Sequence, residues 1–346
     1  MKRLISIAVS LIILAIIYGT IDFQGLIVVF QQCSVSWMAI ALGMVVPLTL
    51  MTAWRFQQLT PPQAKLGLGE ANRLILAASA LNMVLPSKMG DIAKAYFIQD
   101  QGYLSGSLSL SLVIFEKTCD LLSLLIWCAL GLLLYPLKGL VLGLMTISVV
   151  GGLIVGGLLL GSRQFAAVFF GLGNAIAPKP LRAKIASFQT SWFEMQTHIW
   201  LDKAQLAKIA ATSIFIWFLH LLQIWFFILA LRANTPFLAN LALSPLAILA
   251  GLLPFTFAGV GTRDTALILF YKPFLDEPTA AALGLLCTSR YLLPAIGGWP
   301  FLAQYLNKLR QIGKTGKEVS SHKGANKLDT GDFSLRDKER QHDFES

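Results

Sequence analysis

Charged residues are scarce in this sequence compared with soluble proteins. Lys, Arg, Asp and Glu make up 13% of the 346 residues, whereas soluble domains contain about 25%. Several long runs carry no charge at all, and the chain is 55% hydrophobic. Runs of this kind are typical of helices that cross a lipid bilayer. The composition therefore predicts an all-α, polytopic integral membrane protein.

Sequence signatures of ATP use and of hydrolytic catalysis are absent as well. The chain has no GxxxxGK[ST] loop, which argues against an ATP-driven pump, and no HExxH or GxSxG motif. Its four cysteines form no CxxC pair, and three lie in apolar segments, so we interpret them as small embedded residues. We expect no cofactor, no metal site and no disulfide among Cys33, Cys119, Cys128 and Cys287.

The net charge of +10 is spread over loops between apolar segments. A nucleic-acid-binding protein needs an exposed basic face, so we do not expect nucleic acid as a partner. Positive charge in cytoplasmic loops is the expected pattern for a multi-pass protein of the cell (plasma or inner) membrane.

Six apolar segments are long enough to cross a bilayer, which needs about 20 apolar residues. They cover residues 4–22, 36–54, 105–134, 139–161, 207–231 and 279–304. The first resembles a signal peptide, but no A-x-A-like cleavage site follows, so we interpret it as an uncleaved helix. Two further stretches, 73–100 and 241–271, are interrupted by Pro and Gly near their centres.

Lys and Arg alternate between the loops in a way that predicts the topology. Segments 55–103 and 162–206 and the tail are rich in them, whereas 23–35 and 135–138 have few. Because cytoplasmic loops are enriched in Lys and Arg, both termini are expected in the cytoplasm. Each interrupted stretch must then leave on the side where it entered, as a re-entrant hairpin or a pair of short helices. One would enter from each face.

The two interrupted stretches also share one pattern. In each, a Leu-Pro break precedes a glycine-containing turn, a basic residue and an aspartate ("LPSKMGD", "LPFTFAGVGTRD"), and a charged apolar helix follows. Matching interrupted segments indicate a transporter site in an inverted repeat; two unrelated proline kinks are the alternative. The transmembrane domain would span 1–305, with halves of about 1–160 and 206–305 joined by an amphipathic cytoplasmic helix over 163–205. The charged tail, 306–346, is expected to be disordered and cytoplasmic.

The first break is expected to place a helix N-terminus at membrane depth. Pro86 ends one helix, Gly90 permits a turn, and Asp91 can cap the next helix. Such an end carries a partial positive charge that suits an anion. Lys88 lies beside it, and a cation there calls for a compensating anion, which is either a neighbouring carboxylate or a ligand with phosphate or carboxylate.

The second break repeats these features. After Pro254, Gly259 and Gly261 supply the turn, and Arg263 occupies the place of the basic residue next to Asp264. The same two possibilities apply to Arg263: an internal ion pair that holds the hairpin, or a bound anion.

A further cluster lies in the middle of apolar helices. Glu116 and Asp120 are four residues apart and so share a helix face with Lys117 between them. Arg290 occupies a matching place in the last helix and is a candidate partner for either carboxylate, with Asn82 in the same polar cavity. The cluster either binds a ligand or joins the two halves.

Four segments together resemble the lysylphosphatidylglycerol synthase transmembrane (flippase-like) family: "NMVLPSKMGDIAKAYFI", "FEKTCDLL", "LLPFTFAGVGTRDTALILF" and "SRYLL". The resemblance covers about 30–305. The chain departs from the family pattern at Lys117, Ala258 and Asp264, where Arg, Gly and Glu are usual. The residues that match the family pattern are Pro86, Lys88, Gly90, Asp91, Lys94, Glu116, Asp120, Gly259, Gly261, Arg263 and Arg290.

This resemblance implies a stand-alone flippase-like member without the cytosolic synthase domain. The expected function is a lipid flippase or transporter that moves an anionic or lipid-linked head group without direct use of ATP. One alternative is a partner subunit that presents a lipid-linked substrate to a separate glycosyl- or acyltransferase; another is an intramembrane enzyme using Glu116 and Asp120. The expected partner is a membrane lipid. The expected substrate-binding residues are Asn82, Pro86, Lys88, Gly90, Asp91, Lys94, Glu116, Lys117, Asp120, Pro254, Gly259, Gly261, Arg263, Asp264 and Arg290.

Overall fold

The computed structural model describes residues 23–85, 89–135, 139–252 and 261–306. The expected first helix and the charged tail lie outside this part of the chain. So do four of the expected site residues, Pro86, Lys88, Pro254 and Gly259.

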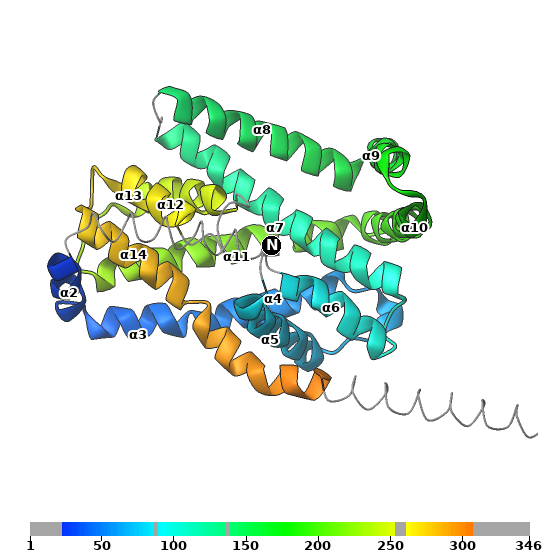
Figure 1. Cartoon of the computed structure of the whole chain (residues 1–346), viewed down its shortest axis with the longest axis horizontal. Helices are drawn as coiled ribbons and strands as arrows, with labels where there is room; N and C mark the ends of the chain where they lie inside the picture. The colour runs from blue at the N-terminus through cyan, green and yellow to red at the C-terminus, as the bar shows by residue number, and fades with distance from the viewer. Residues whose placement is uncertain (1–22, 86–88, 136–138, 253–260, 307–346) are drawn as a thin grey trace, which may run out of the picture. The chain divides into compact units, whose positions relative to one another are not determined.

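The described residues form helices joined by short loops (Figure 1). In chain order the helices are α2 (Phe23–Gln31), α3 (Val35–Gly43), α4 (Val45–Leu59), the short 3-10 helix η1 (Pro62–Ala64), α5 (Leu68–Val84), α6 (Met89–Asp100), α7 (Gly106–Leu134), α8 (Gly139–Gly161), α9 (Arg163–Ile176), α10 (Lys179–Leu201), α11 (Lys203–Ala230), α12 (Phe237–Gly251), α13 (Thr262–Tyr271) and α14 (Glu277–Ser289). A further helical stretch covers 292–306.

Within the described residues, five helices are long and apolar enough to cross a membrane. They are Val35–Leu59, Gly106–Leu134, Gly139–Gly161, Lys203–Ala230 and Glu277–Leu306. These five correspond to the five expected spans that lie in the described part of the chain. The expectation of a helical, multi-pass membrane protein is therefore confirmed.

Polar side chains begin several of the long helices. The Ser105 hydroxyl accepts a hydrogen bond from the Leu108 amide at the start of α7. One carboxylate oxygen of Asp202 accepts from the amides of Ala204 and Gln205, at 2.9 and 3.0 Å, at the start of α11. Such caps satisfy amides that have no partner within the first turn of a helix. They mark where the apolar helices begin.

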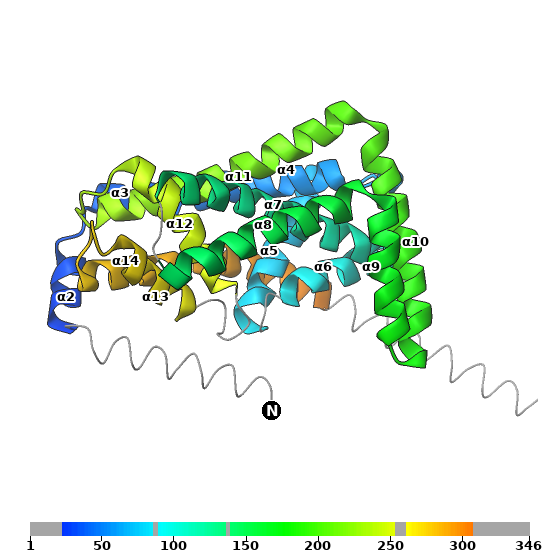
Figure 2. The ribbon, with the colours of Figure 1, turned by 90° about the horizontal axis from the view of Figure 1, so that it is seen from above.

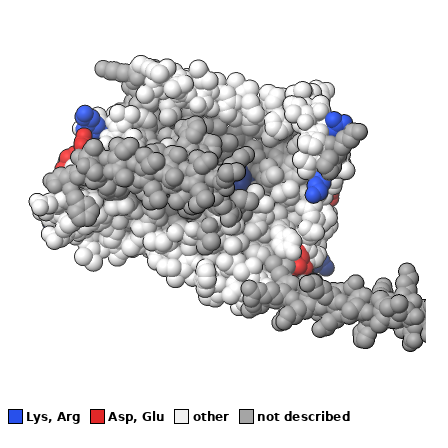
Figure 3. Space-filling view, in the orientation of Figure 1, with Lys and Arg blue, Asp and Glu red and all other residues white. Residues whose placement is uncertain are grey.

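The outward faces of the long helices are apolar. In α8, Leu140 is 78% exposed and Ile147 is 72% exposed. On the face shown in Figure 3, the described surface is largely uncharged, and most of the visible charged side chains lie away from its middle. A surface of this kind is stable only where it faces lipid.

The order of elements repeats along the chain. A long helix, a pair of short helices and a second long helix occur as α3–α4, α5/α6 and α7, and again as α11, α12/α13 and Glu277–Leu306. The short helices have 17, 12, 15 and 10 residues, so at about 1.5 Å per residue none reaches the roughly 30 Å of a bilayer core. The pairs lie toward opposite ends of the bundle (Figures 1 and 2).

The connector between the halves differs from the expectation of one helix over 163–205. It forms two helices, α9 and α10, that lie across one end of the long helices (Figure 2). Pro178 precedes α10 with extended backbone, which interrupts the helix at Ala177. The two helices pack through buried Phe170 and Trp192, whose rings lie 5.9 Å apart.

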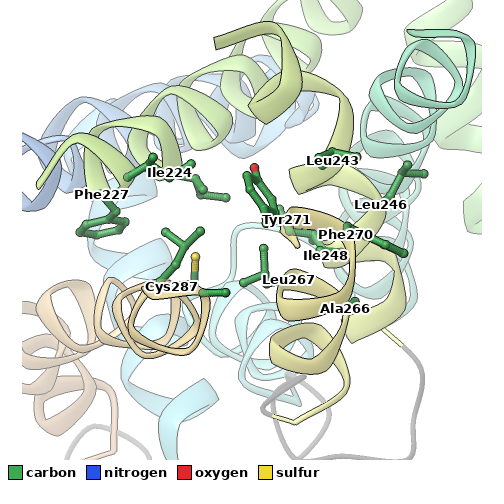
Figure 4. Close-up of a cluster of buried hydrophobic side chains, with 14 of the residues drawn as sticks. Ile224, Phe227, Leu243, Leu246, Ile248, Ala266, Leu267, Phe270, Tyr271 and Cys287 are labelled. Carbon is green, nitrogen blue, oxygen red and sulfur yellow. The ribbon is translucent and has the colours of Figure 1, made fainter. Parts of the chain in front are cut away.

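The core of the second half lies where α11, α12, α13 and α14 meet (Figure 4). Buried apolar side chains fill it, and one polar group is held among them. The hydroxyl of Tyr271 lies 2.7 Å from the hydroxyl of Ser244 and donates to the Asn240 side-chain oxygen at 3.1 Å. Because these groups satisfy one another, they join α12 to α13 without leaving unpaired polar atoms.

Candidate functional site

Six charged side chains of the first half form a closed ring of alternating sign, which we call the charge ring. Each member is ion-paired with the next, and the last with the first. In order around the ring they are Arg55, Glu116, Lys94, Asp91, Lys117 and Asp120. Three cations and three carboxylates make the ring neutral as a whole.

Three helices supply the ring: α4, α6 and α7. Glu116 and Asp120 project from one face of α7, as their spacing predicts, and Arg55 contacts both. Lys94, on α6, pairs with Glu116 and lies 4.7 Å from the centre of the Phe56 ring. Arg55, Lys94 and Glu116 have fully buried side chains, whereas Lys117 is 40% exposed. The ring thus runs from the interior toward a more open side.

Arg55 is the ring member that sequence reasoning missed. The expected helix ended at residue 54, so Arg55 was assigned to a loop, whereas α4 continues to Leu59. Arg55, Phe56 and Leu59 are buried and share one face of this last part of α4. Charge balance could have identified it. Three carboxylates at membrane depth need three cations, and Lys94 and Lys117 supply only two, so every basic residue within or at the end of an apolar run, Arg55 as well as Arg290, was a candidate for the third.

The expected pairing of Arg290 with Glu116 or Asp120 is wrong, because Arg55 takes that place. Arg290 follows α14 at the break before the 292–306 helix and is only 5% exposed. It donates one hydrogen bond, from Nη2 to the Tyr291 hydroxyl at 2.9 Å. Within the described part of the chain, its Nε and Nη1 have no hydrogen-bond partner and no carboxylate pairs with it. A buried cation of this kind calls for an anion.

Arg290 and the charge ring line one cavity of about 480 Å³. Helices of both halves enclose it: α4, α5, α6 and α7 from the first, and α11, α14 and the start of the next helix from the second. Ser79, Asn82, His220 and Gln223 add polar groups to the wall. Its apolar lining is formed by Val45, Leu48, Ile75, Met83, Ile216, Trp217 and Pro294.

The Arg263–Asp264 pair, in contrast, does not line this cavity. Arg263 donates from Nε and Nη2 to one oxygen of Asp264, at 2.9 and 2.6 Å. It also donates to the carbonyl oxygen of Gly284, at 3.0 Å, and to the hydroxyl of Thr288, at 2.6 Å. Its compensating anion is therefore its own neighbour, and its other bonds hold the end of α14. Thr288 does line the cavity, so Arg263 touches the site only through it.

Two expected roles change in the structure. Asp91 was expected to cap its helix, but α6 begins at Met89, so Asp91 lies in the first turn and joins the charge ring. Gly90 packs against α5, where an added Cβ would lie 2.4 Å from the Ala78 carbonyl oxygen. Gly261 has φ +103° and its amide donates to Asp264 at 3.1 Å, so it makes the turn that was expected of it.

The described part of the predicted site therefore divides in two. The cavity brings together Asn82, Asp91, Lys94, Glu116, Lys117, Asp120 and Arg290. The group Gly261, Arg263 and Asp264 lies beside it, in the packing of α13 against α14. The cavity can hold an anion at Arg290 and an apolar group beside it; the Arg263 group fixes a helix end.

Comparison with protein families gives a match over most of the chain. The model of the family described as lysylphosphatidylglycerol synthase TM region matches residues 3–298. A comparison with curated protein sequences found no match. The chain belongs to the lysylphosphatidylglycerol synthase TM family, as its motifs indicated, and this family is associated with lipid handling.

Proposed function

We propose that this member of the lysylphosphatidylglycerol synthase TM family binds the anionic head group of a membrane lipid in its central cavity and moves it across the membrane. It would do so without direct use of ATP. Arg290 carries the proposal. It is a buried cation on the wall of a cavity, and among the described residues its Nε and Nη1 have no partner and no carboxylate compensates its charge.

The position of the cavity supports transport rather than binding alone. Both halves of the chain contribute to its wall, and transporters that work by alternating access bind their substrate at such an interface. Rocking of one half against the other would open the cavity to each side in turn, while the acyl chains stay in the lipid. The proposed site is centred on Arg290, whereas the sequence-based one placed the anion at Lys88 and Arg263. Lys88 lies outside the described residues, and Arg263 is paired with Asp264.

The proposed setting is the cell membrane, with both termini in the cytoplasm. The alternation of Lys- and Arg-rich segments supports this orientation. The two short helix pairs lie toward opposite ends of the bundle, which supports the proposal that one enters the membrane from each face. Both would then be re-entrant pairs of an inverted repeat.

A scrambling assay tests the proposal. Purified protein is placed in liposomes that contain a trace of fluorescent anionic phospholipid, and a membrane-impermeant quencher is added outside. Wild-type protein should expose the inner-leaflet fluorescence that empty liposomes protect. Arg290→Gln should slow this exposure at least about tenfold, since it removes the charge that a buried anion would pair with.

Arg73→Gln is the matched control. Arg73 is exposed, pairs with Glu70 at 3.6 Å, and does not line the cavity. It should scramble at the wild-type rate. The transport proposal would be overturned if liposomes with wild-type protein protected the inner-leaflet fluorescence to the same extent as empty liposomes. If the lipid still binds, the alternative of a subunit that presents lipid to a transferase becomes the better one.

A further inference from the structure

The charged groups on the cavity wall nearly cancel. The described wall residues include four cations, namely Arg55, Lys94, Lys117 and Arg290, and three carboxylates, namely Asp91, Glu116 and Asp120. The charge ring is neutral by itself, so the described residues of the wall together carry one net positive charge, located at Arg290. His220, the other basic group on the wall, is counted as neutral.

The net charge of a buried site is a strong constraint on its guest. Charges at low dielectric interact several times more strongly than in water. An uncompensated charge left in the interior costs about 3–5 kcal/mol. A ligand with one negative charge neutralises the net charge of the described wall residues. A ligand with two negative charges, or with none, leaves one charge unpaired.

We propose that the cavity selects lipids whose head group carries a single negative charge, as a phosphodiester does, over zwitterionic lipids and over phosphomonoester or diphosphate lipids. This inference rests on the proposed function for the identity of the site, and it adds the class of lipid. Arg290 binds the phosphodiester through its Nε and Nη1, which have no partner among the described residues. The charge ring stays closed, because the guest needs none of its cations.

The apolar part of the wall favours a lipid over a free anion. Leu48, Ile75, Met83, Ile216 and Trp217 line the same space as Arg290. A phosphodiester without a hydrophobic part would leave these side chains against water, which gives up the burial of apolar surface. Glycerol and the first methylene groups of acyl chains fit beside them.

Equilibrium binding to the purified, full-length protein in nonionic detergent tests this class, independently of transport. Native mass spectrometry can compare lipids with identical acyl chains at pH 8. The probes are phosphatidylmethanol with one negative charge, phosphatidylcholine with no net charge, and phosphatidic acid, a phosphomonoester that can carry a second negative charge. Inorganic phosphate and glycerophosphomethanol serve as free anions.

Phosphatidylmethanol should bind about tenfold or more tightly than the other two lipids, and neither free anion should compete with it at equal concentration. Equal binding of phosphatidylcholine or phosphatidic acid would overturn the inference and leave the transport proposal standing. Competition by free phosphate at equal concentration would show that the cavity binds the anion without a lipid, and would overturn the selection of lipids. Failure of scrambling together with the expected binding order would overturn transport and leave the inference standing.

Charge variants make the test stricter. Asp120→Asn raises the wall charge by one and should move the preference toward phosphatidic acid, whereas Arg290→Gln lowers it by one and should move it toward phosphatidylcholine. The double variant Asp120→Asn/Arg290→Gln restores one net positive charge and should again prefer phosphatidylmethanol. The inference would be overturned if the order of affinity for the three lipids were the same in all of these variants. The order in the wild-type protein decides the matter even if a variant fails to fold.

Discussion

Glu116 is held by buried partners on two sides. Its side chain is fully buried and ion-paired with two cations, Arg55 and Lys94, that are fully buried as well. Removing one member of such a group leaves a partner charged and unpaired in the interior. This costs far more than the ion pair itself contributes.

Glu116→Gln should therefore lower the free energy of unfolding by about 3–5 kcal/mol. The double variant Glu116→Gln/Lys94→Met should recover much of this loss, because it removes the stranded cation while Asp120 still neutralises Arg55. Thermal unfolding in detergent measures both. Arg73→Gln, which breaks an exposed pair worth less than about 1 kcal/mol, is the control. A double variant less stable than Glu116→Gln would contradict this explanation.

Individual site residues were predictable only in part. The spacing of Glu116 and Asp120 predicted one shared face, and Arg55 contacts both of them there. Their partner was not predictable from spacing, because α4, which carries Arg55, lies far away in sequence. In the sequence, a basic residue at the end of an apolar run looks the same whether the helix ends there or continues with that residue buried.

The helix that follows α14 lies close to α5 at Gly298. An ideal Cβ on Gly298 would lie 1.9 Å from the carbonyl oxygen of Leu76, whereas one on Gly297 would meet nothing within 4 Å. Membrane helices pack closely where a small residue lets two backbones approach. These two neighbouring glycines thus differ in their packing.

Gly298→Ala should destabilise the protein, because the methyl group would force α5 and this helix apart. Gly297→Ala should leave stability unchanged or raise it by up to about 1 kcal/mol, since alanine favours a helix over glycine. Unfolding temperatures of the two variants in the same detergent give the comparison. Equal unfolding temperatures would contradict this, because they would show that the two helices can move apart without loss of stability.

At the scale of elements, the long apolar runs predicted the five described spans well, because length and composition suffice for them. The connector was less predictable. Pro178 divides it into α9 and α10, and both helices then find partners through Phe170 and Trp192. Composition alone could not show these contacts.

For the molecule as a whole, the repeated element order was visible in the sequence through the two Leu-Pro breaks, and the described helices follow it. The cavity was not visible, because its wall combines residues from six places along the chain. Inverted symmetry between the halves stays a prediction.

The charge ring has one more consequence. All its members belong to α4, α6 and α7 of the first half, and the Arg263–Asp264 pair belongs wholly to the second. Every ion pair among the described residues therefore joins two groups of the same half. Movement between the halves breaks none of these ion pairs, so the rate of this movement should not depend on the salt concentration. The rate at which the lipid-free protein exchanges between its two conformations can be followed by energy transfer between one dye on each half. This rate should stay constant between about 0.1 and 1 M salt, although the screening length falls from about 10 to 3 Å. The resistance to motion then comes from apolar packing, from uncharged hydrogen bonds between the halves, such as that from Gln223 to the Ala41 carbonyl oxygen at 2.8 Å, and from the viscosity of the surrounding bilayer.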